Sequence, residues 1–146
     1  MKKLLSALVI MLFSYSAFAQ NTNKLLDNYI TVKNALVSGD SKAASQAVTA
    51  LQQSIQAEDN FAQKDALLKA TATMEKAGNI DKQRAAFNDV STNMWQIVKG
   101  SDKVAEPVFY QYCPMKEAYW LSKEKEIKNP YYGAAMLTCG NVVETK

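Results

Sequence analysis

The chain contains no histidine, and cysteine, proline and glycine are scarce, with 2, 3 and 5 residues among 146. Without histidine, neither a Ser-His-Asp nor a Cys-His catalytic arrangement can form, and the usual ligands of Cu(II) are missing. A tetrahedral zinc site is also hard to assemble, because the two thiolates would need two carboxylates beside them. A P-loop, a GxGxxG loop and a CxxC motif are absent too. We therefore expect a protein that is not an enzyme and has no catalytic residues.

A long apolar run occurs near the N-terminus and is not repeated later. Residues 1–19 begin with Met and two lysines, continue through an apolar run (4–13) and close with an Ala-Phe-Ala sequence that ends at Ala19. This order is typical of a secretory signal peptide. The run is shorter than the roughly 20 residues of a permanent membrane span. We expect cleavage after Ala19, a periplasmic or secreted protein, and no stable membrane insertion after cleavage.

Neither sign of charge dominates the chain. It has 17 basic and 14 acidic residues, and removal of the two lysines of the signal peptide lowers the formal net charge from +3 to +1. A nearly neutral chain has no electrostatic reason to bind nucleic acid or an anionic membrane. The remaining residues, 20–146, have the length of one domain with its own core.

Apolar residues at helical spacing predict four amphipathic helices. In the first, Leu25, Tyr29 and Val32 follow one another at intervals of four and three residues, which places them on one face. In the fourth, Asp81 and Arg84 lie three residues apart, and we expect them to form a surface ion pair. Helices of this length with short connections favour a mainly α fold, an up-and-down antiparallel four-helix bundle over residues 20–100. The predicted helices cover about 22–38, 41–57, 61–77 and 80–99.

The composition changes after the fourth predicted helix. Seven aromatic residues lie between Phe109 and Tyr132, and all 3 prolines also follow this helix. Residues 108–112 are rich in β-formers, and residues 129–133, Asn-Pro-Tyr-Tyr-Gly, have the composition of a turn. We predict that residues 101–146 form a small, aromatic-rich C-terminal cap of short strands and turns, packed on the bundle. The turn should be ordered and held by aromatic side chains.

Both cysteines lie in this cap, and each has a methionine close by in the sequence. Cys113 is followed by Met115, and Met136 precedes Cys139. Thiolate and thioether sulfurs are soft ligands that select Cu(I) over Ca²⁺, Mg²⁺ or Mn²⁺. Two or three such donors satisfy Cu(I). The four residues are therefore candidate ligands of a Cu(I) or Ag(I) site.

The same cysteines can instead form a disulfide. In an oxidising compartment, closing the segment between Cys113 and Cys139 would stabilise the fold by roughly 3.5 kcal/mol in the chain-entropy model. Both alternatives require neighbouring cysteines, which pairing of residues 108–113 with residues 134–139 as adjacent strands would allow in a suitable register. A metal site also requires a methionine thioether that faces the thiols. If the cysteines lie far apart, the sulfurs belong to an ordinary core.

Four short motifs in the cap carry a family resemblance. They are Cys113-Pro114-Met115, Trp120-Leu121-Ser122, Ile127-Lys128-Asn129-Pro130-Tyr131-Tyr132-Gly133 and Met136-Leu137-Thr138-Cys139-Gly140. Together they resemble the C-terminal signature of a family catalogued as a domain of unknown function, numbered thirty-three forty-seven. The resemblance extends to the helical part through Ser-Gly-Asp-Ser at residues 38–41 and through Arg84 and Phe87 before Ser91. Members are typically exported proteins of Gram-negative bacteria, and the domain also occurs attached to efflux adaptors of the copper/silver type.

Two hypotheses about function follow from the residues and the resemblance. The first is a periplasmic module that binds Cu(I) or Ag(I) and is linked to metal efflux or homeostasis, with a heavy-metal efflux adaptor or another envelope protein as its partner. The second is a non-catalytic structural or interaction domain, in which a Cys113–Cys139 disulfide locks the cap and the cap docks on an envelope partner. The resemblance implies an association with copper or related metals and defines no chemistry.

Overall fold

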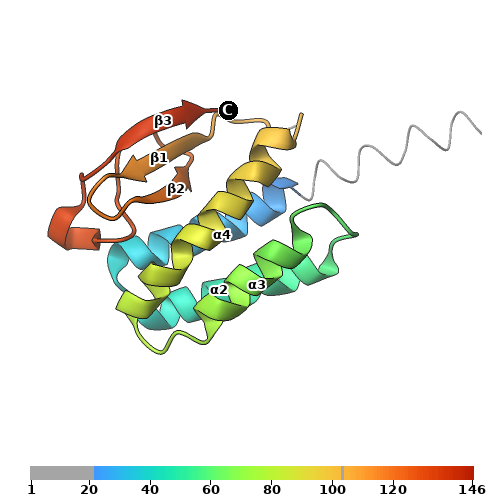
Figure 1. Cartoon of the computed structure of the whole chain (residues 1–146), viewed down its shortest axis with the longest axis horizontal. Coiled ribbons are helices and arrows are strands. Elements are labelled where there is room, and N and C mark those ends of the chain that lie inside the picture. Colours follow the sequence, from blue (N-terminus) through green and yellow to red (C-terminus); the bar gives the residue numbers. More distant parts are fainter. Residues whose placement is uncertain (1–21, 103) are drawn as a thin grey trace, which may run out of the picture.

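The computed structural model describes residues 22–102 and 104–146 and shows four helices beside a small sheet (Figure 1). The predicted signal peptide lies outside the described residues. The prediction of a mainly α, four-helix fold with a cap of short strands is confirmed. Among the described residues, none of the helices combines the length and the apolar character needed to span a bilayer. The elements are the N-terminal helix (residues 22–38), α2 (Ser41–Ala57), α3 (Lys64–Glu75), α4 (Ile80–Gly100), β1 (Phe109–Cys113), β2 (Ala118–Ser122), the 3₁₀ helix η1 (Gly133–Met136) and β3 (Asn141–Thr145).

The helix boundaries follow from local capping. Asp40 accepts a 2.9 Å hydrogen bond from a backbone amide in the first turn of α2, and Asn79 accepts a 3.0 Å bond in the same way at α4. Both helices begin where the sequence predicts. By contrast, α3 begins at Lys64, three residues later than predicted, and ends at Glu75. Gln63, which precedes it, makes no side-chain capping bond, so nothing extends the helix toward residue 61.

The sheet is antiparallel and has the strand order β2-β1-β3. Cys113 at the end of β1 is opposite Ala118 at the start of β2, and residues 114–117 form the turn between them. On its other side β1 pairs with β3, with Tyr112 opposite Asn141. The central strand therefore ends beside the segment that leads into β3.

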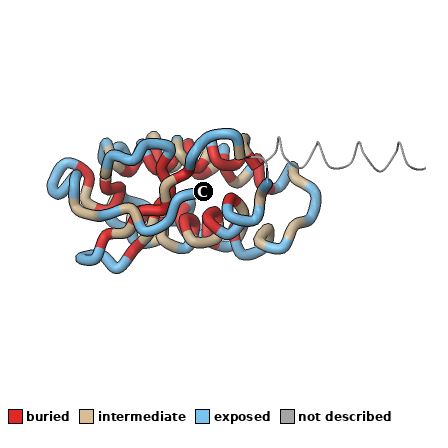
Figure 2. The backbone as a smooth tube through the Cα atoms, turned by 90° about the horizontal axis from the view of Figure 1, so that it is seen from above, coloured by how far each residue is buried: buried red, intermediate tan, exposed pale blue. Residues whose placement is uncertain are grey.

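Tyr29 connects the helices to the sheet. Its ring is fully buried and stacks on Phe87 of α4 with the ring centroids 5.2 Å apart. Its hydroxyl lies 2.7 Å from the Ser91 hydroxyl and accepts a 3.0 Å hydrogen bond from the backbone amide of Leu121 in β2. Figure 2 shows how burial is distributed along the backbone, with buried residues in the interior and exposed residues along the outer loops. The N-terminal helix, α4 and β2 thus share one core.

Burial of tyrosine makes the stability of this core sensitive to high pH. Burial raises the pKa of Tyr29 and of Tyr131 well above the usual range for tyrosine, and it raises the pKa of Tyr110 to about 12. An acid with a higher pKa in the folded state loses its proton first in the unfolded state. Its contribution to stability is therefore complete below the unfolded pKa of about 10 and is lost as the pH rises toward the folded value.

We predict that the free energy of unfolding falls above about pH 10, by up to about 1.4 kcal/mol per pH unit for each of these tyrosines. Urea denaturation between about pH 8 and pH 11, followed by circular dichroism, measures the slope. Tyr29→Phe should cost about 1–3 kcal/mol at pH 8, because the Ser91 hydroxyl and the Leu121 amide lose a buried partner. Its stability should also fall less steeply with pH than that of the wild type. Equal slopes would contradict the role given to Tyr29.

The turn at residues 129–133 is ordered and held by aromatic rings, as predicted. Tyr131 is only 6 % exposed, and its ring centroid lies 6.0 Å from that of Phe87 and 6.1 Å from that of the fully buried Trp120. The Tyr131 hydroxyl donates a hydrogen bond to the backbone carbonyl of Tyr119 in β2. The turn is therefore fixed to α4 and to the sheet at once.

Arg84 of α4 ties this turn to the N-terminal helix. Its Nε donates a 2.9 Å hydrogen bond to the Pro130 carbonyl, and its Nη2 donates a 2.8 Å bond to the Leu36 carbonyl. The predicted ion pair with Asp81 is wrong, since no such pair occurs among the ion pairs of the described residues. The half-buried guanidinium instead binds two backbone carbonyls from distant parts of the chain. We call this arrangement the Arg84 bridge.

Gly133 ends the turn directly against the Arg84 bridge. Its backbone has a φ of 55°, a conformation that residues with a Cβ rarely adopt. A Cβ at this position would lie 2.6 Å from Arg84 Nη2 and 2.7 Å from the Val37 carbonyl oxygen. Both the conformation and the space therefore require glycine here.

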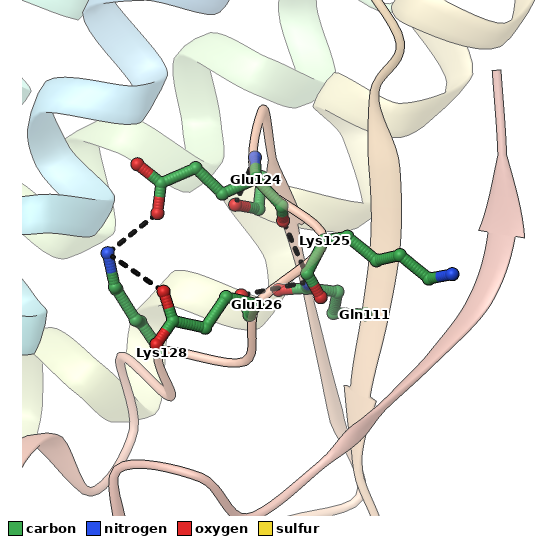
Figure 3. A network of polar contacts seen from close by, with 6 residues as sticks. Gln111, Glu124, Lys125, Glu126 and Lys128 are labelled. Atoms are coloured by element: carbon green, nitrogen blue, oxygen red, sulfur yellow. Dashed lines mark hydrogen bonds and ion pairs between the residues drawn. The ribbon is translucent and has the colours of Figure 1, made fainter.

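A buried amide holds the charged loop after β2 over the sheet. Gln111 of β1 is fully buried, and its Nε2 donates hydrogen bonds of 3.1, 3.2 and 3.4 Å to the carbonyls of Glu124, Lys125 and Glu126 (Figure 3). Lys128 pairs with the Glu124 and Glu126 carboxylates at 2.7 and 3.5 Å. Because Gln111 is two residues from Cys113 in the same strand, the loop covers the face of β1 that also carries Cys113.

Candidate functional site

The two cysteines lie side by side where β1 ends and the segment between η1 and β3 passes it. Cys113 is the last residue of β1, and Cys139 lies two residues before β3. Their sulfur atoms are 3.5 Å apart, so the prediction that they are neighbours is confirmed. Both cysteines are free thiols, whereas a disulfide would hold the sulfurs about 2.05 Å apart. The structure therefore contains a dithiol and not the disulfide of the second hypothesis.

The strand that brings the cysteines together differs from the prediction. Residues 134–139 do not pair with β1, because residues 133–136 form η1 and the next two residues form a turn. β3, at Asn141–Thr145, takes the place beside β1. The positive φ at Gly133, which is packed against Arg84 and the Val37 carbonyl, directs the chain from the aromatic turn into η1. Extended backbone resumes only after Cys139.

Two backbone amides of the turn between β1 and β2 form hydrogen bonds with the Cys113 sulfur. Burial raises the pKa of the Cys113 thiol. Hydrogen bonds with the backbone amide of Lys116, with the Cys139 and Asn129 side chains and with the backbone amide of Met115 lower this pKa. The net result is a pKa below the usual range for cysteine. Pro114 explains this geometry, because it sets φ at the first position of the turn and leaves the two following amides free to face the preceding side chain.

Cys139 shares a hydrogen bond with Cys113, in which either sulfur can be the donor. Its hydrogen bond with Cys113 raises the pKa of the Cys139 thiol, and burial raises it further. The two pKa values therefore move in opposite directions. Cys113 is fully buried and Cys139 is partly exposed. Solvent therefore reaches this pair of thiols from the side of Cys139.

The two methionines of the predicted site lie at the surface. Met115 is 62 % exposed and Met136 is 36 % exposed, and neither belongs to the core that includes both cysteines. Each is tied to the site through its backbone. The Met115 amide binds the Cys113 sulfur, and the Met136 carbonyl accepts a 3.1 Å hydrogen bond from the Cys139 amide. The structure thus brings the thiols together and leaves both thioethers outside.

Gly140 fixes the approach of Cys139 to the sheet. Its φ is 146°, and a Cβ would lie 2.7 Å from Cη2 of the Trp120 ring and 2.9 Å from the Tyr112 carbonyl oxygen. Only glycine lets the backbone pass this close to a buried tryptophan. The backbone at Gly140 therefore packs directly against the core.

The donor set of the site excludes several metal centres. Within residues 22–102 and 104–146, no three or more His, Cys, Asp or Glu residues form a group that could hold a metal ion. Structural zinc needs four ligands, and an iron–sulfur cluster needs more cysteines than this chain has. A metal at this site must accept two sulfur donors as its main ligands.

A family model described as "Protein of unknown function (DUF3347)" matches residues 25–105, which is more than half of the chain. The chain belongs to the DUF3347 family. The family membership predicted from the sequence is therefore confirmed, although the four cap motifs lie outside the matched residues. The DUF3347 match covers the helical bundle and ends before Cys113, so both cysteines lie outside the matched residues. No curated protein and no solved structure matched the chain.

Sequence reasoning identifies the two cysteines but misses the polar residues that hold this part of the DUF3347 chain. The spacing on α4 places Arg84 in a surface ion pair, and the sequence marks Asn129 only as a turn residue. An Asn-Pro pair signals a turn, but its partners elsewhere in the chain cannot be read from that signal. The amides of Met115 and Lys116 carry no side-chain signal at all, apart from the preceding Cys-Pro pair.

Proposed function

We propose that this DUF3347 protein is a module that binds Cu(I) or Ag(I) between Cys113 and Cys139. The observation that supports the proposal is the pair of free sulfurs 3.5 Å apart. Thiolates are soft ligands and select soft cations such as Cu(I). Binding of a metal ion displaces the thiol protons, and the lowered pKa of Cys113 favours this loss.

The methionines supply a third donor in this proposal. Met115 and Met136 are anchored next to the thiols by their backbones, and their side chains are exposed and long enough to change rotamer. A thioether from one of them completes a three-coordinate sulfur site after such a change. The thiols are then the main ligands, and each methionine makes a smaller contribution.

The wider role is proposed from the predicted signal peptide and the family resemblance. We propose a periplasmic or secreted, non-catalytic protein that takes part in metal efflux or homeostasis. A heavy-metal efflux adaptor or another envelope protein is the proposed partner. This part of the proposal rests on the family resemblance, which implies an association with efflux adaptors of the copper/silver type.

Titration of the reduced protein with Cu(I) tests the metal site. The protein competes anaerobically with the chromophoric Cu(I) chelator bathocuproine disulfonate, and the absorbance of the chelator complex reports the affinity. We expect one Cu(I) per chain. Cys113→Ser and Cys139→Ser should each lower the affinity by about a hundredfold or more, because each removes a direct ligand. Met115→Leu and Met136→Leu should lower it by about tenfold or less.

Thr138→Ala is the matched control, because Thr138 is exposed and adjoins Cys139 in the chain. Its affinity for Cu(I) should equal that of the wild type. Equal affinity in the wild type and in both serine variants would rule out the dithiol as a metal site. The hypothesis of a structural domain would then be preferred, and mass spectrometry of the protein as isolated would show whether its cysteines are oxidised.

A further inference from the structure

We infer that Asn129 is the positioning residue of the dithiol, because it holds the backbone of Cys139 beside Cys113. The Asn129 side chain is fully buried, and its Nδ2 donates a 2.7 Å hydrogen bond to the Cys139 carbonyl. This bond joins residues ten positions apart and acts directly on the residue that carries the second thiol. The inference deepens the proposed function. Only the expected effect of Asn129 on metal binding rests on that function, whereas its effect on the position of the thiols does not.

The other polar atoms of Asn129 fix the same segment at further points. Oδ1 accepts hydrogen bonds of 2.8 and 3.3 Å from the amides of Tyr131 and Tyr132, which shapes the aromatic turn. The backbone amide of Asn129 donates a 2.8 Å hydrogen bond to the Leu137 carbonyl, two residues before Cys139. One buried residue therefore holds both the start and the end of the segment between the turn and Cys139.

The chemistry of the site requires asparagine rather than aspartate. Nδ2 must donate to a carbonyl, whereas Oδ1 must accept from amides, and only a side-chain amide offers both at this length. Aspartate would keep the acceptor that shapes the turn. The Asn129 side chain also forms a hydrogen bond with the Cys113 sulfur. Aspartate would place a carboxylate oxygen against the Cys139 carbonyl and near this sulfur, and the repulsion would push the segment away from β1.

This difference separates a positioning role from an ordinary turn-forming role. Asn129→Asp keeps the turn acceptor and loses the donor to Cys139, whereas Asn129→Ala loses both. If Asn129 only shapes the turn, the aspartate variant should resemble the wild type. If it positions Cys139, both variants should separate the thiols.

Cross-linking of the reduced protein with dibromobimane tests this without a metal. The reagent becomes strongly fluorescent when it bridges two thiols, so the rate of fluorescence increase reports their proximity. We expect both Asn129 variants to cross-link about tenfold more slowly and to bind Cu(I) about tenfold more weakly, with Thr138→Ala unchanged. Cys139→Ser gives the background rate. Wild-type cross-linking in Asn129→Asp would overturn the inference.

Circular dichroism and thermal unfolding show whether the variants are folded. If neither variant folds, hydrogen exchange of the Asn129 side-chain amide in the wild type replaces the comparison. Slow exchange of this amide supports the bond to Cys139, and exchange at the rate of an exposed asparagine overturns it. Failure of the wild type to bind Cu(I) would remove the proposed function and leave the cross-linking result intact, so the two failures are distinguishable.

Discussion

Gly133→Ala is expected to lower the free energy of unfolding by about 2–5 kcal/mol. Alanine is strained at the φ of 55° that this position requires. Its Cβ would also lie 2.6 Å from Arg84 Nη2 and 2.7 Å from the Val37 carbonyl oxygen. The side-chain atom can move away only if the Arg84 bridge opens, and the backbone oxygen belongs to the N-terminal helix. Neither neighbour can yield without loss of other contacts.

Urea denaturation at neutral pH measures this loss, and Gly78→Ala is its control. Gly78 lies in the connection between α3 and α4, and its φ is not positive. A Cβ added there would meet no atom of the described residues within 4 Å. Its substitution should change the stability by less than about 1 kcal/mol. Equal stability of Gly133→Ala and Gly78→Ala would contradict the close packing described around Gly133.

Arg84→Met should cost about 2–4 kcal/mol, the second largest effect that we expect. Methionine keeps much of the apolar side-chain volume but cannot donate to the Leu36 and Pro130 carbonyls, which then lose a charged partner. Arg84→Lys should cost less, because one ammonium group can reach one of the two carbonyls but cannot reproduce the fork of a guanidinium. The comparison therefore separates loss of geometry from loss of charge.

Lys82→Met serves as the control for loss of a positive charge on α4, since Lys82 is exposed. Its stability should lie within about 0.5 kcal/mol of the wild type. Combining Arg84→Met with Gly133→Ala adds a second test. The two changes act on one junction, so the double variant should lose less stability than the two single losses together. Strict additivity would show that Arg84 and Gly133 act independently.

The helices were predictable because their signals are local. The apolar spacing and the side-chain caps at Asp40 and Asn79 define α2 and α4 within the segments themselves. The predicted start of α3 was wrong, since no cap marks it in the sequence. Phe61 continues the apolar pattern into the preceding connection, and periodicity alone cannot show where a helix stops.

The site was predictable in its cysteines and not in its geometry. Because the chain contains only two cysteines and both lie in the short cap, the sequence indicated Cys113 and Cys139 as the site. Their actual partners depend on contacts between remote segments, such as the bond from Arg84 to Pro130 and the placement of Gly133 beside it. These contacts select β3 rather than residues 134–139 as the neighbour of β1. Exposure of the methionines likewise depends on the finished packing.

The position of β1 between two strands has a consequence for the order of assembly during synthesis. The chain is synthesised from its N-terminus, so the residues of β1 and β2 are available before Cys139 and β3. Until β3 is added, the nascent chain carries a single thiol next to an unpaired strand edge, which can pair with another chain. The two-sulfur site is thus the last part of the domain to be completed. A chain that ends before Cys139 should therefore form intermolecular disulfides through Cys113 under oxidising conditions.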